Sequence, residues 1–301
     1  MQRSLKQLPA SDRVVLITPA RNEAAHLRLA IRSIERQTHR PAQWILVNDG
    51  STDETGAIAR EAAERHAWIR VVDRQDRGRR VLGGGVIEAF DHGLAHVSVP
   101  YDYLAKVDAD VTVGPRYLER CLTLFAEDPR LGALSGKVYR EEQGAQVEEF
   151  MIDEMVAGQW KLYRRACFED IGGFVRRVMW DGIDFHSARQ KGWHTRSVDE
   201  RDLRILHHRL MGSSDRNVLV GRLRWGRGQW FMGTHPLYML ASASLRMLER
   251  PLCIGGLAIL AGYVQAWLRG SERYRAPGFR EELRRWQIQR LRTLATRGTI
   301  R

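Results

Sequence analysis

Short apolar runs alternate with helix-like segments in the first third of the chain, and this alternation constrains the fold more than any other feature. Four runs rich in Val, Ile and Leu are typical of buried strands: residues 14–18, 44–47, 69–72 and 103–107. Between them, residues 24–37 place apolar side chains at near-helical spacing, and residues 81–97 form a second plausible helix. Strands that alternate with helices predict an α/β domain with a mostly parallel sheet and helices on both faces.

A polar segment rich in charged and turn-forming residues follows each predicted strand, at residues 19–23, 48–53, 73–80 and 108–110. Ligands of parallel sheets bind beyond the carboxyl ends of the strands, so we expect these four segments to meet at one edge. Asp49 would accept hydrogen bonds from a base or ribose. Positive charge for phosphates would come from Arg21, Arg77, Arg79 and Arg80. Taken singly, these segments also fit capped surface turns and solvated arginines.

Two carboxylates, Asp108 and Asp110, stand one residue apart at the end of the fourth predicted strand. The two carboxylates repel each other unless a cation lies between them. A site made of oxygen ligands favours hard divalent ions such as Mg²⁺ or Mn²⁺. An ion held by one or two carboxylates usually completes its shell with phosphate oxygens and water. The pair therefore predicts a site for a metal and a diphosphate, although Asp-x-Asp triplets also occur in surface loops.

Three motifs appear in a fixed order, each after a predicted strand: Pro19-Ala-Arg-Asn-Glu23, Val47-Asn-Asp-Gly-Ser-Thr-Asp53 and Asp108-Ala-Asp110. Over roughly residues 13–210 they resemble the signature of family 2 glycosyltransferases with the GT-A fold. The resemblance implies nucleotide contacts by Ala20, Glu23, Asp49 and Asp108, with Pro19 and Arg21 in the same first motif. It also implies that Asp110 holds the metal. Arg79 lies in a segment similar to a Gly-Lys segment of the family, with Arg in place of Lys.

A candidate catalytic base lies in Trp180-Asp-Gly-Ile-Asp184, after a Gly-Gly-Phe turn that also resembles the family. The family normally has Glu-Asp here, and matching the motif without gaps puts Asp181 on that Asp and Trp180 on the Glu. Asp184 is the alternative if the register shifts. A carboxylate near the acceptor hydroxyl can take its proton during attack on the anomeric carbon. The alternative, purely structural role for Asp181 is that of a helix N-cap.

The next predicted strand, residues 203–206, ends in His207 and His208. An imidazole can complete the coordination of a cation such as Mn²⁺, and we expect His207 to be the ligand, with His208 as the alternative. Arg222-Leu-Arg-Trp225 partly resembles the Q-x-x-R-W motif of processive family members. Gly221 stands where Gln should be, so transfer of a single sugar is expected.

The last third of the chain differs from the rest in charge and in hydropathy. Residues 201–301 hold 19 Arg, no Lys and 6 Asp or Glu, a balance of +13, so the first 200 residues carry −1 of the net +12. Residues 231–245 and 251–268 have no formal charge, and residues 279–300 form an Arg-rich segment with Phe279, Leu283 and Trp286. A spanning helix needs roughly 20 apolar residues, so we expect helices that lie in or dip into an anionic membrane face. A buried helical hairpin is the alternative.

These features predict a nucleotide-sugar-binding catalytic domain over residues 1–215 and a membrane-associating helical region over residues 216–301. Three scattered cysteines suggest a reducing compartment without a zinc site. The N-terminus lacks the apolar core of a signal peptide, which favours the cytoplasmic side of a membrane. No nucleic-acid-binding module is recognised, so nucleic acid is not an expected partner.

The predicted function is inverting, metal-dependent transfer of one sugar from a nucleoside diphosphate to an acceptor hydroxyl. A lipid-linked or glycan acceptor in cell-envelope or exopolysaccharide synthesis is the expected partner. One alternative is a sugar-nucleotide pyrophosphorylase, but residues 19–23 are not the Gly-rich loop that such an enzyme needs after its first strand. Another is a non-catalytic membrane-surface protein of the same fold.

Overall fold

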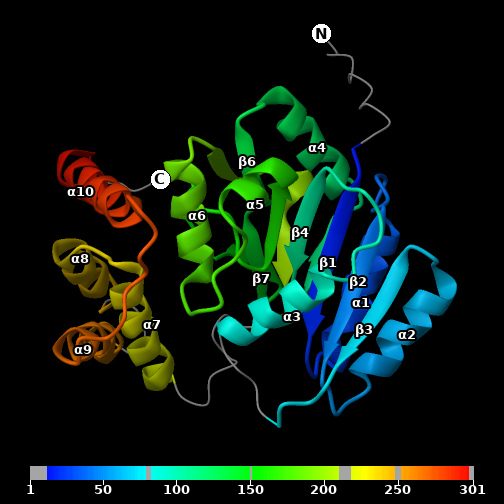
Figure 1. Cartoon of the computed structure of the whole chain (residues 1–301), viewed down its shortest axis with the longest axis horizontal. Coiled ribbons are helices and arrows are strands. Elements are labelled where there is room, and N and C mark those ends of the chain that lie inside the picture. Colours follow the sequence, from blue (N-terminus) through cyan, green and yellow to red (C-terminus); the bar gives the residue numbers. More distant parts are fainter. Residues whose placement is uncertain (1–11, 79–82, 150, 210–217, 248–251, 298–301) are drawn as a thin grey trace.

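The computed structural model describes residues 12–78, 83–149, 151–209, 218–247 and 252–297, built around a seven-stranded sheet (Figure 1). In spatial order its strands are β10 (His194–Val198), β6 (Leu131–Gly136), β9 (Trp160–Arg164), β4 (Tyr103–Val107), β1 (Val14–Ala20), β2 (Gln43–Asp49) and β3 (Ile69–Arg74). β1 pairs in parallel with β2 and β4, and β2 pairs in parallel with β3. The four predicted strands therefore form one parallel block, and the expected mostly parallel α/β fold is confirmed.

Helices cover both faces of this sheet because alternate strand residues point to opposite sides. Val14 and Leu16 of β1 belong to the core beneath α1, α2 and α4, whereas Val15 and Ile17 belong to the core beneath α3, α5 and α6. These helices are α1 (Ala24–Glu35), α2 (Thr55–Arg65), α3 (Gly84–Leu94), α4 (Tyr117–Glu127), α5 (Arg165–Asp170) and α6 (Trp180–Gln190). Strands buried on both faces explain why the apolar runs were nearly continuous.

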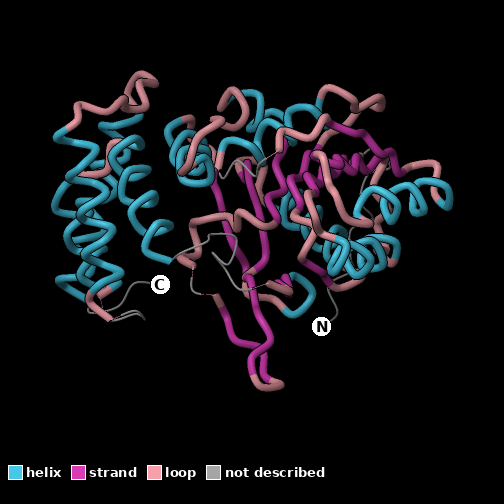
Figure 2. The backbone as a smooth tube through the Cα atoms, turned by 90° about the horizontal axis from the view of Figure 1, so that it is seen from below, coloured by secondary structure: helices cyan, strands magenta, loops and turns pink. Residues whose placement is uncertain are grey.

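A second, four-stranded sheet has the order β5 (Val111–Val113), β11 (Ile205–His207), β7 (Val138–Glu142) and β8 (Ala145–Glu148). β7 and β8 form a hairpin that projects from the body (Figure 2). β11 runs antiparallel to β5 with His207 opposite Val111. This pairing brings His207 next to the chain just after Asp110, although the two residues are far apart in sequence.

Two segments fold differently from what their sequences indicate. The pattern of residues 132–140 predicts a single strand, but the structure divides it into β6 and β7, which belong to different sheets. A Cβ on Gly136 would lie 1.4 Å from the carbonyl oxygen of Leu203, so only glycine fits where the chain passes from one sheet to the other. Residues 159–164 are polar and basic in sequence, but β9 lies within the main sheet with the side chain of Lys161 fully buried.

Four C-terminal helices pack beside α6 on one side of the molecule (Figure 1). They are α7 (Val218–Met232), α8 (Pro236–Arg246), α9 (Ile254–Leu268) and α10 (Phe279–Arg297). A Cβ on Gly226 of α7 would lie 2.0 Å from the carbonyl oxygen of Ile259, and one on Gly262 of α9 would lie 2.1 Å from that of Leu223. The glycines of this region thus let α7 and α9 cross in close contact. The predicted boundary at residue 215 lies outside the described residues.

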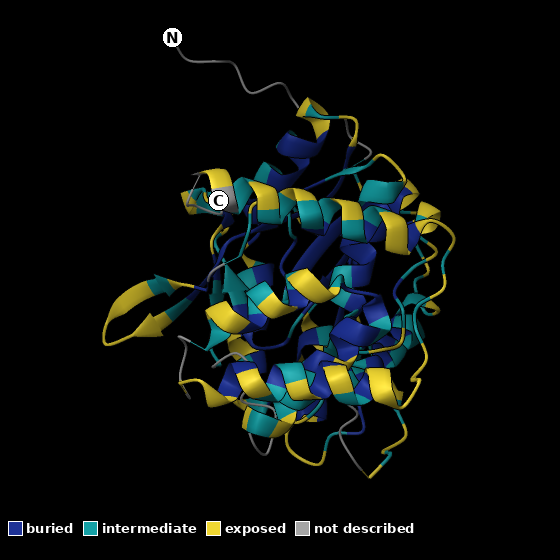
Figure 3. Cartoon of the chain, turned by 90° about the vertical axis from the view of Figure 1, so that its left-hand side faces the viewer, coloured by how far each residue is buried: buried dark blue, intermediate teal, exposed yellow. Residues whose placement is uncertain are grey.

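The apolar side of α10 packs inside the protein, so this part of the membrane prediction is wrong. Phe279 and Leu283 are fully buried with Ile183 of α6 and Met232 of α7. Exposed large apolar side chains occur instead on α8 and α9: Leu237, Leu240, Leu245, Ile254, Leu257, Val264, Trp267 and Leu268. Figure 3 shows exposed residues along the outer helices on this side of the molecule. None of the helices within the described ranges is long and apolar enough to cross a membrane.

Candidate active site

A cavity of about 660 Å³ opens at the carboxyl ends of β1, β2 and β4. It gathers predicted site residues from distant parts of the chain: Pro19, Ala20, Arg21, Glu23, Asp49, Asp108, Asp110, Asp181 and His207. Arg79 lies outside the described residues, and Asp184 is absent from the cavity wall. The loops after the predicted strands therefore meet at one edge, as the parallel pairing requires.

The first two motif loops are tied together by hydrogen bonds. The backbone amide of Asn22 donates to the hydroxyl of Ser51, and the amide of Thr52 donates to the side-chain oxygen of Asn22. Asp53 accepts from the amides of Ala24 and Thr55, at the starts of α1 and α2. The single carboxylate of Asp53 therefore caps the first turns of both helices and fixes them at the cavity edge.

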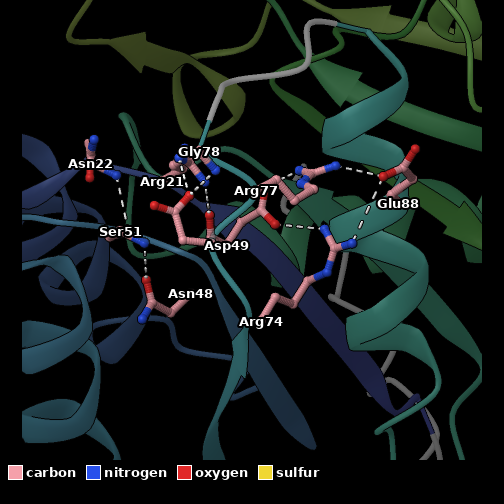
Figure 4. A network of polar contacts seen from close by, with 10 residues as sticks. Arg21, Asn22, Asn48, Asp49, Ser51, Arg74, Arg77, Gly78 and Glu88 are labelled. Atoms are coloured by element: carbon pink, nitrogen blue, oxygen red, sulfur yellow. Dashed lines mark hydrogen bonds and ion pairs between the residues drawn. The ribbon is translucent and has the colours of Figure 1, made fainter.

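Arginines surround the carboxylate of Asp49 (Figure 4). Arg74 and Arg77 each donate to one of its oxygens at 2.6 Å, and Arg77 also pairs with Glu88 at 2.6 Å. Arg21 donates to the backbone oxygen of Asp49 at 2.7 Å. The carboxylate of Asp49, which lines the cavity, is thus held in place by two guanidinium groups.

Asp110 and His207 form the second part of the site. His207 Nε2 lies 3.7 Å from Asp110 Oδ2, and His207 Nδ1 lies 3.2 Å from Glu149 Oε1. A carboxylate on the far ring nitrogen fixes the orientation of an imidazole and is the usual partner of a metal-binding histidine. Burial disfavours the charged ring, but the contacts with Asp110 and Glu149 outweigh it and raise the pKa of His207 to about 9.

His208 faces away from this pair. Its Nε2 lies 2.9 Å from the hydroxyl of Thr112, and its ring stacks on His26 at a centroid distance of 6.1 Å. Its backbone amide, not its ring, contacts Asp110 by donating to the carbonyl oxygen of that residue. Of the two histidines considered from the sequence, His207 is therefore the one whose ring meets Asp110.

Basic side chains contact the carboxylates of Asp108 and Asp110. The ammonium group of Lys106 bonds to Asp108 and to the carbonyl oxygen of Gly158, and it is almost fully buried. Arg209 lies 3.6 Å from Asp110 and pairs with Glu23. Burial acts to raise the pKa of Asp110, but His207 and Arg209 outweigh it and lower the pKa below its usual value.

The residues present fit a divalent cation held jointly by the protein and a diphosphate. Across the described part of the chain, no group of three or more His, Cys, Asp and Glu side chains converges as a complete metal site. Asp110 and His207 would supply one oxygen and one nitrogen ligand on the cavity wall, with the ring of His207 oriented by Glu149. A cation bound there would need further oxygens from a ligand or water, which is the usual arrangement for Mg²⁺ with phosphates.

Asp181 and Asp184 of α6 lie in different environments. Asp181 lines the cavity, in the first turn of the helix. Asp184 is buried, with its carboxylate bonded to Lys161 at 2.6 and 2.8 Å and to the hydroxyl of Tyr163 at 2.5 Å. Both of its oxygens therefore bind groups of the sheet, which leaves Asp181 as the carboxylate that meets the cavity.

The ring of Trp180 lies close to two buried ammonium groups. Its ring centroid is 5.1 Å from Lys106 Nζ and 5.2 Å from Lys161 Nζ, within the range of cation–π attraction. The aromatic face thus takes the place that the family resemblance gives to a glutamate. Lys161 also donates to the carbonyl oxygen of Asp181 at 3.0 Å, so it connects β9 directly to the start of α6.

Helices after residue 215 complete the cavity wall. Gln229 and Met232 of α7, Tyr238 of α8 and Trp286 of α10 all line it. A Cβ on Gly182 would lie 3.1 Å from Met232 Sδ, which shows how closely α7 approaches the helix that bears Asp181. The C-terminal region is therefore part of the site, a role that its charge and hydropathy did not indicate.

Sequence reasoning missed Glu149, Lys161 and these C-terminal residues. Glu149 is 6% exposed but follows an acidic, exposed hairpin, so nothing in the sequence separates it from its solvated neighbours. The sequence signal for this strand is the spacing of Trp160 and Leu162, two apolar residues on either side of Lys161, which is compatible with a strand.

Comparisons with known proteins show the family and the fold of the chain. The family model described as Glycosyl transferase family 2 matches residues 15–176. The chain is 31% identical over 188 residues to the glycosyltransferase GlyA of Streptococcus pneumoniae serotype 4, covering 57% of this chain and 27% of GlyA. It is 28% identical over 118 residues to a poly-beta-1,6-N-acetyl-D-glucosamine synthase of Staphylococcus aureus, covering 38% of this chain and 26% of the synthase. The matched segments thus span about a quarter of these relatives' length.

Two solved structures share the fold at low sequence identity. The mannosyltransferase PcManGT from Pyrobaculum calidifontis, in complex with GDP-Man and Mn²⁺, has a TM-score of 0.53 at 20% identity, covering 96% of this chain and 76% of that chain. S. aureus TarS in complex with UDP-GlcNAc has a TM-score of 0.53 at 17% identity, covering 89% and 75%. The structural likeness shows a GT-A type α/β fold. Because the family model covers more than half of its length, the chain belongs to glycosyl transferase family 2.

Proposed function

We propose that this protein is an inverting, metal-dependent glycosyltransferase that moves one sugar from a nucleoside-diphosphate sugar to an acceptor hydroxyl. The observation that carries the proposal is that Asp49, the Asp110–His207 pair and Asp181 line one continuous cavity. A donor site, a cation site and a base are the three elements that such a transfer requires.

The donor lies at the edge formed by the first two motifs. The nucleoside contacts Asp49 and the backbone near Ala20, and the diphosphate lies toward Asp110 and His207. A divalent cation held by these two residues supplies Lewis-acid stabilisation of the leaving diphosphate. Asp108 and Lys106 flank the same position, and Arg209 adds positive charge beside the phosphates.

Asp181 receives the proton of the acceptor hydroxyl as that oxygen attacks the anomeric carbon. Asp181 belongs to α6 and the cation-binding pair to the ends of β4 and β11, so the proposed base and the proposed leaving-group site come from different elements of the cavity lining. Displacement in line inverts the anomeric centre. The pyrophosphorylase alternative loses support from the family match over residues 15–176.

A metal-dependent donor panel tests this function. Thermal unfolding is measured with UDP- and GDP-sugars, each with and without Mn²⁺. A matching donor at about 100 times its Kd stabilises the fold by roughly 2.7 kcal/mol, and we expect this gain to require the metal. His207→Ala should abolish the metal-dependent part, whereas His208→Ala should keep it, since only the ring of His207 meets Asp110. Failure of every nucleotide sugar to stabilise the protein would refute the proposal.

We further propose that the protein works on the cytoplasmic side of an anionic membrane, on a lipid-linked or glycan acceptor in envelope or exopolysaccharide synthesis. Support comes from exposed apolar residues on α8 and α9 and from the +13 balance of residues 201–301. Leu257 and Trp267 of α9 are 55% and 59% exposed, and Arg269 follows at the helix end. Apolar burial together with attraction to anionic lipids is the usual basis of surface binding by such helices.

Vesicle co-sedimentation tests the membrane proposal. The full chain should bind vesicles containing phosphatidylglycerol and should bind pure phosphatidylcholine much less. Leu257→Glu and Trp267→Glu are expected to release it, because each places a charge on the exposed face of α9. Leu29→Glu is the matched control, since Leu29 is 42% exposed on α1, outside the C-terminal helices. Equal binding of all three variants would contradict the proposed surface.

A further inference from the structure

The cavity extends past Asp181 into a chamber between α6 and the C-terminal helices. We call this the aromatic chamber and define it by Phe185, His186, Tyr238 and Trp286, all of which line the cavity. His186 lies five residues beyond Asp181 on α6, a rise of about 7.5 Å along the helix axis. Asp181 and the residues of the chamber therefore line the same cavity, at successive turns of α6.

His186 is a buried polar group that lines this chamber. It is 6% exposed, and among the residues that the structure describes neither of its ring nitrogens has a hydrogen-bond partner. Burial, together with the charge of Arg189, lowers the pKa of His186 to about 3. The imidazole is thus neutral and offers one donor and one acceptor.

Rings from three helices enclose this imidazole. The ring centroid of His186 lies 4.9 Å from that of Trp286, which lies 6.1 Å from that of Tyr238. The indole nitrogen of Trp286 donates to Glu154 at 3.1 Å, which fixes the orientation of its ring. The chamber therefore combines oriented aromatic faces with a hydrogen-bonding group that no described residue satisfies.

We infer that the aromatic chamber binds the carbohydrate part of the acceptor. His186 forms a hydrogen bond with a sugar hydroxyl, and the sugar ring stacks on Trp286 or Tyr238. This inference rests on the proposed transferase function. Pyranose rings have apolar faces and hydroxyl edges, which match aromatic walls with a few polar groups. A hydrocarbon chain would leave the nitrogens of His186 unsatisfied, at a cost comparable to a lost hydrogen bond. Acceptor recognition is thereby assigned to α6, α8 and α10 together.

Binding of simple glycosides tests the inference. Methyl β-glucoside, methyl α-mannoside and methyl β-N-acetylglucosaminide are titrated against the full chain by ligand-observed NMR, with 1-octanol as the hydrocarbon probe. The titration is run with and without UDP or GDP plus Mn²⁺. At least one glycoside is expected to bind saturably, and His186→Phe is expected to weaken it about tenfold. His186→Gln, which keeps a donor and an acceptor, should stay within about threefold of the parent protein.

A second variant covers the case in which His186→Phe fails to fold. Tyr238→Ala removes a wall contributed by α8 without altering α6, and it should also weaken glycoside binding. Unchanged glycoside affinity in Tyr238→Ala and in folded His186→Phe would overturn the inference, as would saturable binding of octanol with no glycoside bound. Absence of nucleotide-sugar binding would instead refute the transferase function, because glycoside binding is also measured without nucleotide.

Discussion

Replacing Asp181 with Asn is expected to lower the rate of sugar transfer by about 10²- to 10⁴-fold, the usual contribution of a general base. Asparagine has nearly the same shape, so the cavity keeps its form while the proton acceptor is lost. Asp181 bonds to Lys161 through its backbone oxygen, and this bond survives the substitution. Donor affinity should therefore change by less than about threefold. The measurement is the release of nucleoside diphosphate from the donor, with water or a glycoside as the nucleophile.

Asp184→Asn is the matched comparison, since Asp184 was the alternative base and lies on the same helix. Its carboxylate is bonded to Lys161 and Tyr163 in the core, so its replacement should mainly reduce the stability of the fold. If the rate of sugar transfer falls by tenfold or less in Asp181→Asn, Asp181 is not the general base. Absence of donor turnover in the parent protein and in both variants would favour the non-catalytic interpretation of the fold.

The strand-end loops could be predicted because their order is a local property of the sequence. Apolar runs followed by polar segments at Asp49 and Asp110 define a parallel sheet edge without any knowledge of long-range contacts. The sequence alone did not show whether the ring of His207 or that of His208 lies next to Asp110. That depends on the long-range pairing of β11 with β5, which puts His207 opposite Val111. The choice between Asp181 and Asp184 likewise needed the partner of Lys161.

What the sequence could not indicate depends on tertiary partners. Lys161 made β9 look exposed, although its charge is neutralised by a carboxylate from a different element. Phe279 and Leu283 have the helical spacing of residues that bind a lipid surface, but in the structure they pack against α6 and α7. Amphipathic periodicity shows that a helix has an apolar side, but it carries no information on whether protein or lipid covers that side.

Removing the charge of Lys161 should have the largest effect on stability. Lys161 and Asp184 are 0% and 1% exposed, and their charged atoms are 2.6 Å apart. Breaking a buried ion pair leaves one uncompensated charge and typically costs about 3–5 kcal/mol. Lys161→Met should therefore lower the free energy of unfolding by this order, measured by urea denaturation. Arg28→Met is the control, because the Arg28–Glu61 pair is about half exposed and such pairs contribute at most about 1 kcal/mol.

The double variant Lys161→Met/Asp184→Leu separates the structural role of the pair from its effect on the site. Replacing both charges with apolar groups of similar volume is often neutral for stability, so much of the loss in Lys161→Met should be recovered. Transfer activity should not recover to the same extent, because the carbonyl oxygen of Asp181 still lacks its donor and Trp180 still lacks one of its two cations. Recovery of stability and activity together would show that Lys161 serves only the core. Recovery of stability alone would show that β9 positions the base through the first turn of α6.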